Sequence, residues 1–273
     1  MDDAIHNRMM DALQVVKQNG HTPIYIALIG SQNYGLSTPS SDYDFKCIVL
    51  PSLTGLCKRE GDVSKVYSVG SGEVDVKDIH SFVSILCKMN PQYLEPLITR
   101  HYMADEAYAP LLSQLRDLAP ELVKEMRLPL LHAIQGMVRN KLVEIKHGIS
   151  FNRKYDGKKL YQAYRFYRLA SFVREGKFPL VLPEEDRLFC QRCRNGEFSS
   201  HKAESMCRDW NNELLTIFNG DSLTVSSVSK EEAVRLAAEI QLQGCLQDAQ
   251  QIMNQRKENT YAPIVFHEGL SSV

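Results

Sequence analysis

The sequence lacks long hydrophobic runs: no stretch approaches the roughly 18 apolar residues that a membrane-spanning helix requires. Glycine and proline, at 15 and 11 residues, are not enriched, which excludes collagen-like and low-complexity chains. The acidic start lacks the basic and apolar regions of a secretory signal. The seven cysteines are odd in number and scattered, which argues against a disulfide framework. We therefore expect a cytoplasmic protein that does not bind membranes.

Net charge is also nearly absent, because 32 basic residues oppose 33 acidic ones and leave a formal charge of -1. This balance argues against a protein that coats nucleic acid through charge alone. The composition is otherwise that of a globular protein, with 44% hydrophobic and 24% charged residues. The length of 273 residues fits one large domain or two small ones.

Short strand patterns come first along the chain, and helical patterns follow. We expect strands at 24–29, 43–50 and 66–76, with a turn at the glycines of the last segment. Apolar residues three and four positions apart predict the helices. The expected helices cover 2–19, 78–90, 108–117, 120–147 (broken at Pro129), 158–175, 200–218 and 229–257.

This order predicts an α+β fold: a small mixed β-sheet domain with flanking helices, followed by a mainly helical domain. We expect the first domain to cover residues 1–110 and the helical domain 111–258. Residues 259–273 lack periodicity and are expected to form a tail.

Three acidic residues follow a Gly-Ser turn in an arrangement that suits metal-dependent chemistry. Gly30 and Ser31 end the first strand, and Asp42 and Asp44 are spaced to project from one face of the second. Asp75 stands between valines on the third strand candidate. Paired carboxylates are favourable beside a cation, and Mg²⁺ prefers such oxygen ligands together with substrate phosphates. The turn would let phosphate oxygens approach the backbone.

The identity of the third carboxylate has two alternatives nearby. Glu73 and Asp78 are both close enough to Asp75 in sequence to compete for its role. Asp78 also precedes a helical pattern, and we expect it to cap that helix.

Several stretches resemble the DNA polymerase β superfamily of nucleotidyltransferases, and more narrowly its RNA repair pathway branch. The resemblance covers roughly residues 20–200. It rests on Gly30–Leu36, Ser40–Asp44, Asp78–Pro91 with Leu94-Glu95, Gly157–Tyr161 with Arg165, and Arg194–Phe198.

This resemblance implies transfer of a nucleoside monophosphate from an NTP, with two Mg²⁺ ions, or Mn²⁺, as cofactors. It implies that Asp42, Asp44 and Asp75 are the catalytic metal ligands. It further implies that the nucleotide contacts a second group of residues. These are Gly30, Ser31, Tyr34, Ser41, Lys158 and Arg165.

The main charge anomaly is the segment 139–177, where eleven basic against three acidic residues give a local formal charge of +8. Seven aromatic residues are interleaved with them. One interpretation is a binding surface, whose basic side chains contact phosphate and whose aromatic side chains stack on bases. The other is an amphipathic helix, in which one row of side chains enters the core and another faces solvent. Both remain open, and an NTP alone would explain the cluster.

The acceptor is also open: an RNA 3′ end such as that of tRNA, a protein hydroxyl or a small molecule. A catalytically silent binding or regulatory module of the same fold is the alternative to an enzyme. Cys190 and Cys193, followed by His201 and Cys207, do not have a standard zinc-site spacing, which favours reduced cysteines.

Overall fold

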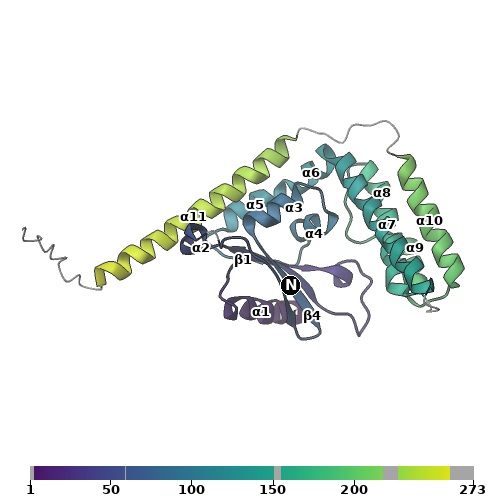
Figure 1. The fold of residues 1–273 in the computed structure, drawn as a ribbon, viewed down its shortest axis with the longest axis horizontal. Coiled ribbons are helices and arrows are strands. Elements are labelled where there is room, and N and C mark those ends of the chain that lie inside the picture. Colours follow the sequence, from purple (N-terminus) through teal and green to yellow (C-terminus); the bar gives the residue numbers. More distant parts are fainter. Residues whose placement is uncertain (1–2, 59, 151–154, 218–226, 259–273) are drawn as a thin grey trace, which may run out of the picture.

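The computed structural model describes residues 3–58, 60–150, 155–217 and 227–258. A five-stranded sheet of order β3-β4-β2-β1-β5 has one helix on one face and several on the other (Figure 1). β2 and β4 pair in parallel, and the other neighbours are antiparallel. The strands are β1 (Thr22–Ile29), β2 (Asp44–Leu50), β3 (Ser64–Val69), β4 (Gly72–Asp78) and β5 (Tyr102–Ala104).

Both faces of the sheet are buried, because alternate residues of its central strands enter two different cores. On one face, Phe45 and Cys47 of β2 pack with Met9 of helix α1 (Asp3–Gln18). On the other face, Ile48 packs with Phe82 and the helices that follow the sheet. A continuous run of buried residues in β2 is therefore expected from its position between two layers.

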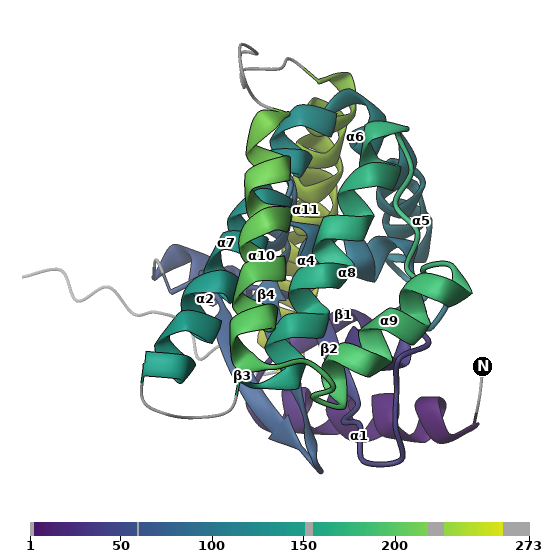
Figure 2. The same ribbon diagram turned by 90° about the vertical axis from the view of Figure 1, so that its right-hand side faces the viewer.

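The remaining helices form two groups (Figure 1). One group consists of α7, α8, α9 and α10, which pack side by side as a bundle (Figure 2). The other lies on the sheet unit and includes α11, which runs back along α2, α3 and α5. Their bounds are α2 (Leu53–Cys57), η1 (Gly30–Gln32), α3 (Ile79–Leu86), α4 (Pro91–Ile98), α5 (Ala109–Asp117), α6 (Ala119–Glu125), α7 (Arg127–Ser150), α8 (Gly157–Arg174), α9 (Glu184–Arg194), α10 (Ser200–Thr216) and α11 (Val228–Glu258).

The α+β class, the mixed sheet and the helical C-terminal region are confirmed. The break expected near Pro129 occurs at Met126, so the proline lies in the first turn of α7, where its missing N–H costs nothing. Asp78 caps α3 as predicted, with its Oδ1 accepting from Ser81 N at 2.8 Å. β5 and the short α2 were not expected from the sequence.

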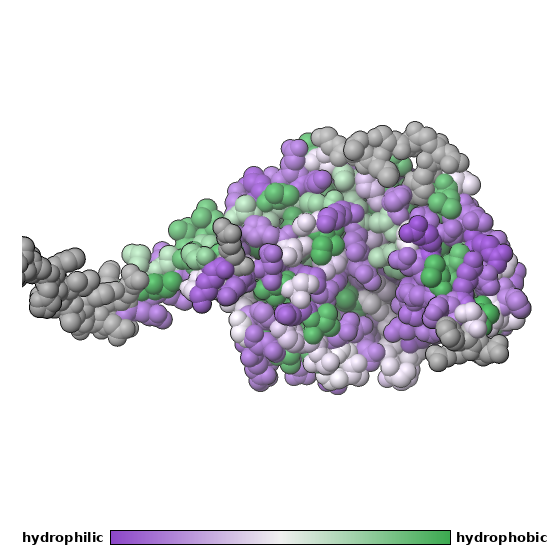
Figure 3. Space-filling model, viewed as in Figure 1, coloured by the Kyte–Doolittle hydropathy of each residue, from purple (hydrophilic) through white to green (hydrophobic). Residues whose placement is uncertain are grey.

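The division at residue 110 stays a prediction, and one core cluster runs through both parts of the chain. The expected tail, 259–273, lies outside the described residues. α11 extends past the sheet unit, where hydrophobic side chains gather on its surface (Figure 3). Among them, Leu242, Leu246 and Met253 are exposed.

None of the helices in the described part of the chain combines the length and apolar character needed to cross a membrane. All seven cysteines are free thiols. Cys190, Cys193 and Cys207 are buried in the helical bundle, and burial raises the pKa of each of these thiols to about 12.

Candidate active site

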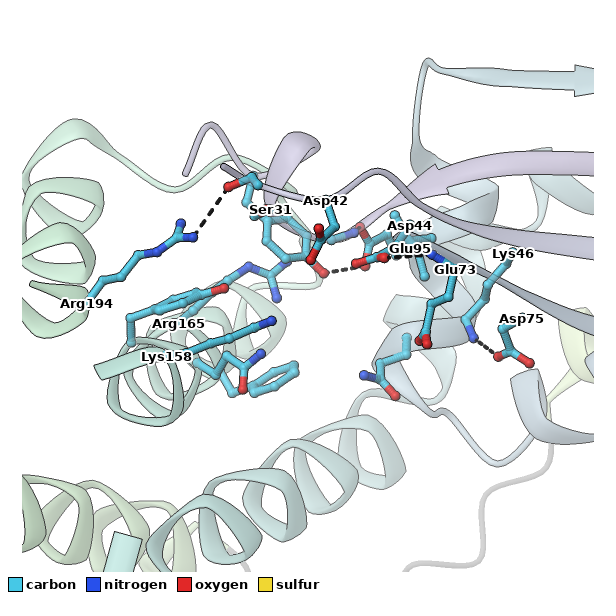
Figure 4. A pocket seen from close by; sticks show the side chains of 18 of the residues that line it. Ser31, Asp42, Asp44, Lys46, Glu73, Asp75, Glu95, Lys158, Arg165 and Arg194 are labelled. Carbon is cyan, nitrogen blue, oxygen red and sulfur yellow. Dashed lines mark hydrogen bonds and ion pairs between the residues drawn. The ribbon is translucent and has the colours of Figure 1, made fainter. Parts of the chain in front are cut away.

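A cavity of about 630 Å³ lies where β1 ends and β2 and β4 begin. All nine residues predicted to bind metal or nucleotide line it. Figure 4 shows the carboxylates of the sheet unit on one side and the cationic side chains of α8 and α9 on the other. The cavity is therefore built by both the strand-rich and the helical parts of the chain.

Three carboxylates stand together at the sheet edge. Asp44 is the first residue of β2, Asp42 precedes it by two positions, and Glu73 lies beside them on β4. The parallel register aligns Phe45 with Val74, which brings Glu73 next to Asp44, and Glu73 N donates to Asp44 Oδ1 at 3.3 Å.

Like charges crowd around Asp44 at this end of the sheet. Burial raises the pKa of Asp44, and the neighbouring charges of Glu73 and Asp42 raise it further, while the hydrogen bond from Glu73 N and the charge of Lys158 lower it. Within the described residues, none of these three carboxylates has an ion pair. Such a group of carboxylates suits a bound cation.

Asp75 has a different environment, although it lies on β4 beside β2 as the sequence predicts. The register places it next to Lys46, and it forms ion pairs with Lys46 and with Lys77, the latter at 2.9 Å. Tyr93 Oη donates to the same carboxylate at 3.4 Å. Burial alone would raise the pKa of Asp75, but the two ammonium groups hold it below its ordinary value.

The third metal ligand therefore stays a prediction. Asp75 forms ion pairs with two lysines, and Asp78 caps α3, whereas Glu73 interacts with Asp44 through its backbone N–H and through its charge. As the described side chains stand, no three of them form a ready-made metal site.

The Gly-Ser turn is held by a buried carboxylate from α4. Gly30 has φ +83°, a conformation that favours glycine, and a Cβ there would stand 3.5 Å from Asp44 Oδ2. Its N–H donates to Glu95 Oε1 at 2.8 Å, and Asn33 Nδ2 donates to the same oxygen at 3.2 Å. The N–H of Gly30, which the sequence suggested for phosphate, is thus already used by the protein.

Tyr34 and Arg165 continue this buried network into α8. Tyr34 Oη donates to Glu95, and the Arg165 guanidinium lies 3.2 Å from the centre of the Tyr34 ring. Glu95 and Arg165 are only 3% and 5% exposed. Burial raises the pKa of Glu95, while the charge of Arg165 opposes the shift. These residues fix the turn against the helical bundle.

The cations of the cavity differ in whether protein carboxylates already neutralise them. Lys46 and Lys77 pair with Asp75, and Lys141 pairs with Glu144. In the part of the chain that the structure describes, Lys158, Arg165 and Arg194 form no ion pair. Arg165 is buried against the Tyr34 ring, whereas Lys158 is exposed and Arg194 half-buried, so these last two are the cations most accessible to an anionic ligand.

Both interpretations of the basic segment therefore apply to different residues. Lys158 and Arg165 line the cavity, whereas Lys159 pairs with Glu144, and Arg168 pairs with the buried Asp186. Arg153, Lys154 and Phe151 lie outside the described residues.

Sequence reasoning gave no role to Lys46 or Lys77, and it named Arg194 only as part of a stretch that resembles the family; all three line the cavity. A signal for the lysines was present, because each follows an acidic residue of interest by two positions on a strand and so shares its face. Arg194 is distant in sequence, and only the packing of α9 brings it to the site.

The family model described as RNA repair pathway DNA polymerase beta family matches residues 5–179. The match includes the turn, the carboxylates and α8 but ends before Arg194. Among solved structures, a nucleotidyltransferase-like protein from Exiguobacterium sibiricum 255-15 matches 91% of this chain over 80% of its own. The two share 13% sequence identity, with a TM-score of 0.28. No curated protein matches this sequence. Because the family model matches more than half of the chain, the chain belongs to the RNA repair pathway DNA polymerase beta family.

Proposed function

We propose that this protein is a magnesium-dependent nucleotidyltransferase of the cytoplasm, which transfers a nucleoside monophosphate from an NTP to an acceptor hydroxyl. One observation carries the proposal: Asp42, Asp44 and Glu73, which form no ion pair in the described residues, share a cavity with Lys158 at the end of the Gly-Ser turn. Acids on one wall and free cations on the other suit a metal-bound triphosphate.

The carboxylates fit a divalent cation by their chemistry. Asp42 and Asp44 supply hard oxygen ligands at a place where like charges crowd, so a cation there would relieve their repulsion. Asp75 or Glu73 would complete the set. When bound, Mg²⁺ would neutralise phosphate charge and lower the pKa of the acceptor hydroxyl.

The other residues have separate tasks. Ser31 and Ser41 line the cavity beside the carboxylates and offer hydroxyl groups to phosphate oxygens. Lys158 supplies positive charge from α8. Gly30, Tyr34 and Arg165 shape the turn around Glu95, because Gly30 N and Tyr34 Oη donate to the Glu95 carboxylate and the Arg165 guanidinium lies over the Tyr34 ring. Catalysis would then depend on positioning and on electrostatic stabilisation of phosphoryl charge.

The Asp44→Asn variant tests the reaction. We expect it to abolish Mg²⁺-dependent incorporation of label from [α-³²P]NTP, because the substitution removes a ligand charge while keeping the size of the side chain. Asp117→Asn, at an exposed position on α5, is the matched control and should retain wild-type turnover. Unchanged turnover in Asp44→Asn would contradict the mechanism.

We propose an RNA 3′ end, such as that of tRNA, as the acceptor, since the family name associates this fold with RNA repair. Incubation of the protein with each labelled NTP and a mixed cell lysate identifies the acceptor by which molecules gain label. Label in RNA that survives protease and disappears with ribonuclease supports the proposal. Label confined to protein or to small molecules contradicts the RNA acceptor while leaving the transfer reaction in place.

A further inference from the structure

Arg194 lies beyond residues 5–179, the segment that the family model matches, and it begins the Arg194–Phe198 stretch that resembles the family in sequence. It is the last residue of α9, and it lines the same cavity as Asp42 and Asp44. Its Nη1 donates to the carbonyl of Leu36 at 2.8 Å, and its Nη2 donates to Ser41 Oγ at 3.4 Å. The guanidinium thus lies on the loop that joins the Gly-Ser turn to the first carboxylates.

The position of Arg194 is fixed by close packing of α9 against the start of α8. A Cβ on Gly157 would lie 2.4 Å from the carbonyl oxygen of Arg194 and 2.7 Å from that of Cys193. The two helix ends therefore touch through their backbones. This contact puts Arg194 and Lys158 on one wall of the cavity, opposite the carboxylates (Figure 4).

The chemistry of this wall favours a polyanion. Three cavity cations, Lys158, Arg165 and Arg194, form no ion pair in the described residues, and of these Arg165 is buried against the Tyr34 ring. A guanidinium has five N–H donors, so its two hydrogen bonds to the loop leave further donors for phosphate oxygens. Arginine binds phosphate through paired hydrogen bonds, whereas lysine acts as a point charge.

We propose that Arg194 is a substrate-binding residue that contacts the β- or γ-phosphate of the NTP together with Lys158. The inference rests on the proposed function, and it adds to the site a residue beyond the segment 5–179 that the family model matches. Its hydrogen bonds to Leu36 and Ser41 hold the guanidinium in place, so that little side-chain freedom is lost on binding.

Nucleotide binding measured without turnover tests this role. Isothermal titration with the four α,β-methylene NTP analogues, in Mg²⁺, first identifies the analogue that the wild-type protein binds most tightly. We expect Arg194→Ala to weaken that analogue roughly 10- to 100-fold, because a charge-assisted hydrogen bond is lost. Binding of the corresponding NMP, which lacks the β- and γ-phosphates, should change much less. Arg194→Lys should bind the analogue with intermediate affinity.

Arg192→Ala is the matched control, because Arg192 lies on the same helix but is exposed and pairs with Glu197. It should bind both ligands as the wild type does. Wild-type affinity of Arg194→Ala for the analogue would overturn the inference, as would an equal loss of analogue and NMP, which would indicate that Arg194 only supports the loop. If the wild-type protein binds no NTP analogue, the proposed function fails together with this inference.

Discussion

At the scale of single residues, the candidate site contains two carboxylates that differ in what surrounds them. Asp44 crowds against other acids, whereas Asp75 lies between two ammonium groups. The same residue type thus serves as a site for an incoming cation in one place and as a partner for resident cations in the other. The buried Lys46 makes this difference possible.

The buried lysines give a prediction for Asp75→Asn. The side chains of Lys46 and Lys77 are 7% and 13% exposed, so removal of their shared partner leaves two poorly solvated charges. We expect a loss of about 3 kcal/mol in the free energy of unfolding, the lower range for breaking a buried pair. Chemical denaturation in the presence of EDTA measures this without any contribution from bound metal.

Glu144→Gln is the control, since Glu144 also lies between two lysines but its side chain is 38% exposed. It should cost no more than about 1 kcal/mol. A cost for Asp75→Asn as small as that of Glu144→Gln would contradict a stabilising role for the Lys46 pair.

The stabilisation by Asp75 should also depend on pH in a defined direction. The lysines hold its pKa in the folded protein below the ordinary value. The folded state therefore favours the carboxylate, and the stability advantage over Asp75→Asn is complete above the unfolded pKa of about 3.9. It should be lost as the pH falls through the lower folded pKa. An advantage that grows on acidification would contradict this sign.

At the scale of secondary-structure elements, the backbone contact between α8 and α9 sets the cationic wall. Gly157→Ala would push a Cβ into the carbonyls of Cys193 and Arg194 and force the two helix ends apart. We expect a loss of roughly 1–3 kcal/mol in stability, as for other overpacked contacts, and weaker binding of NTP because Lys158 and Arg194 both move. Thermal unfolding and nucleotide titration measure the two effects.

Gly136→Ala provides the contrast, because Gly136 lies within α7 and a Cβ there meets nothing within 4 Å. This substitution should stabilise the protein by about 0.5–1 kcal/mol through helix propensity. If Gly157→Ala left both stability and NTP binding undiminished, as expected for Gly136→Ala, the close contact between α8 and α9 would not be needed for either.

The elements that the sequence predicted are those with a local signal. β1, β2 and the helix after Asp78 follow from apolar periodicity and from a capping residue, and the structure has them at the expected places. β5 has three residues, too few for a periodicity, and it exists because β1 offers an edge for pairing. Its formation depends on tertiary contacts that no local pattern contains.

The site was predictable to the same extent. The Gly-Ser turn and the aspartates are close in sequence, so their spacing alone indicated a common edge. Glu95 binds Gly30 across 65 positions, and Arg194 binds Leu36 across 158. Lys46 was missed for another reason: a lysine in an apolar strand is usually exposed, and only a partner on the next strand makes its burial tolerable.

At the scale of the whole molecule, the basic segment 139–177 is less available than its formal charge suggests. Several of its cations are paired within the protein, among them Lys141 and Lys159 with Glu144, and Arg168 with Asp186. The near-zero net charge therefore arises both from local ion pairs and from regions of opposite charge. An RNA bound to segment 139–177 would therefore release fewer counterions than contact with all eleven basic residues would.

This argument predicts the salt dependence of RNA binding. If all eleven cations contacted single-stranded RNA, the logarithm of the association constant would fall with the logarithm of salt concentration with a slope of about −8. We expect a slope of about −2 to −4, because a pair such as Lys159–Glu144 already satisfies its charges inside the protein. Fluorescence anisotropy of a labelled tRNA over a NaCl series gives the slope, and Lys158→Ala should reduce its magnitude by roughly 0.7.

Lys177→Ala is the control, since Lys177 pairs with Glu175 and its removal should leave the slope unchanged. A wild-type slope near −8 would mean that these internal pairs open when RNA binds, contrary to the arrangement in the structure.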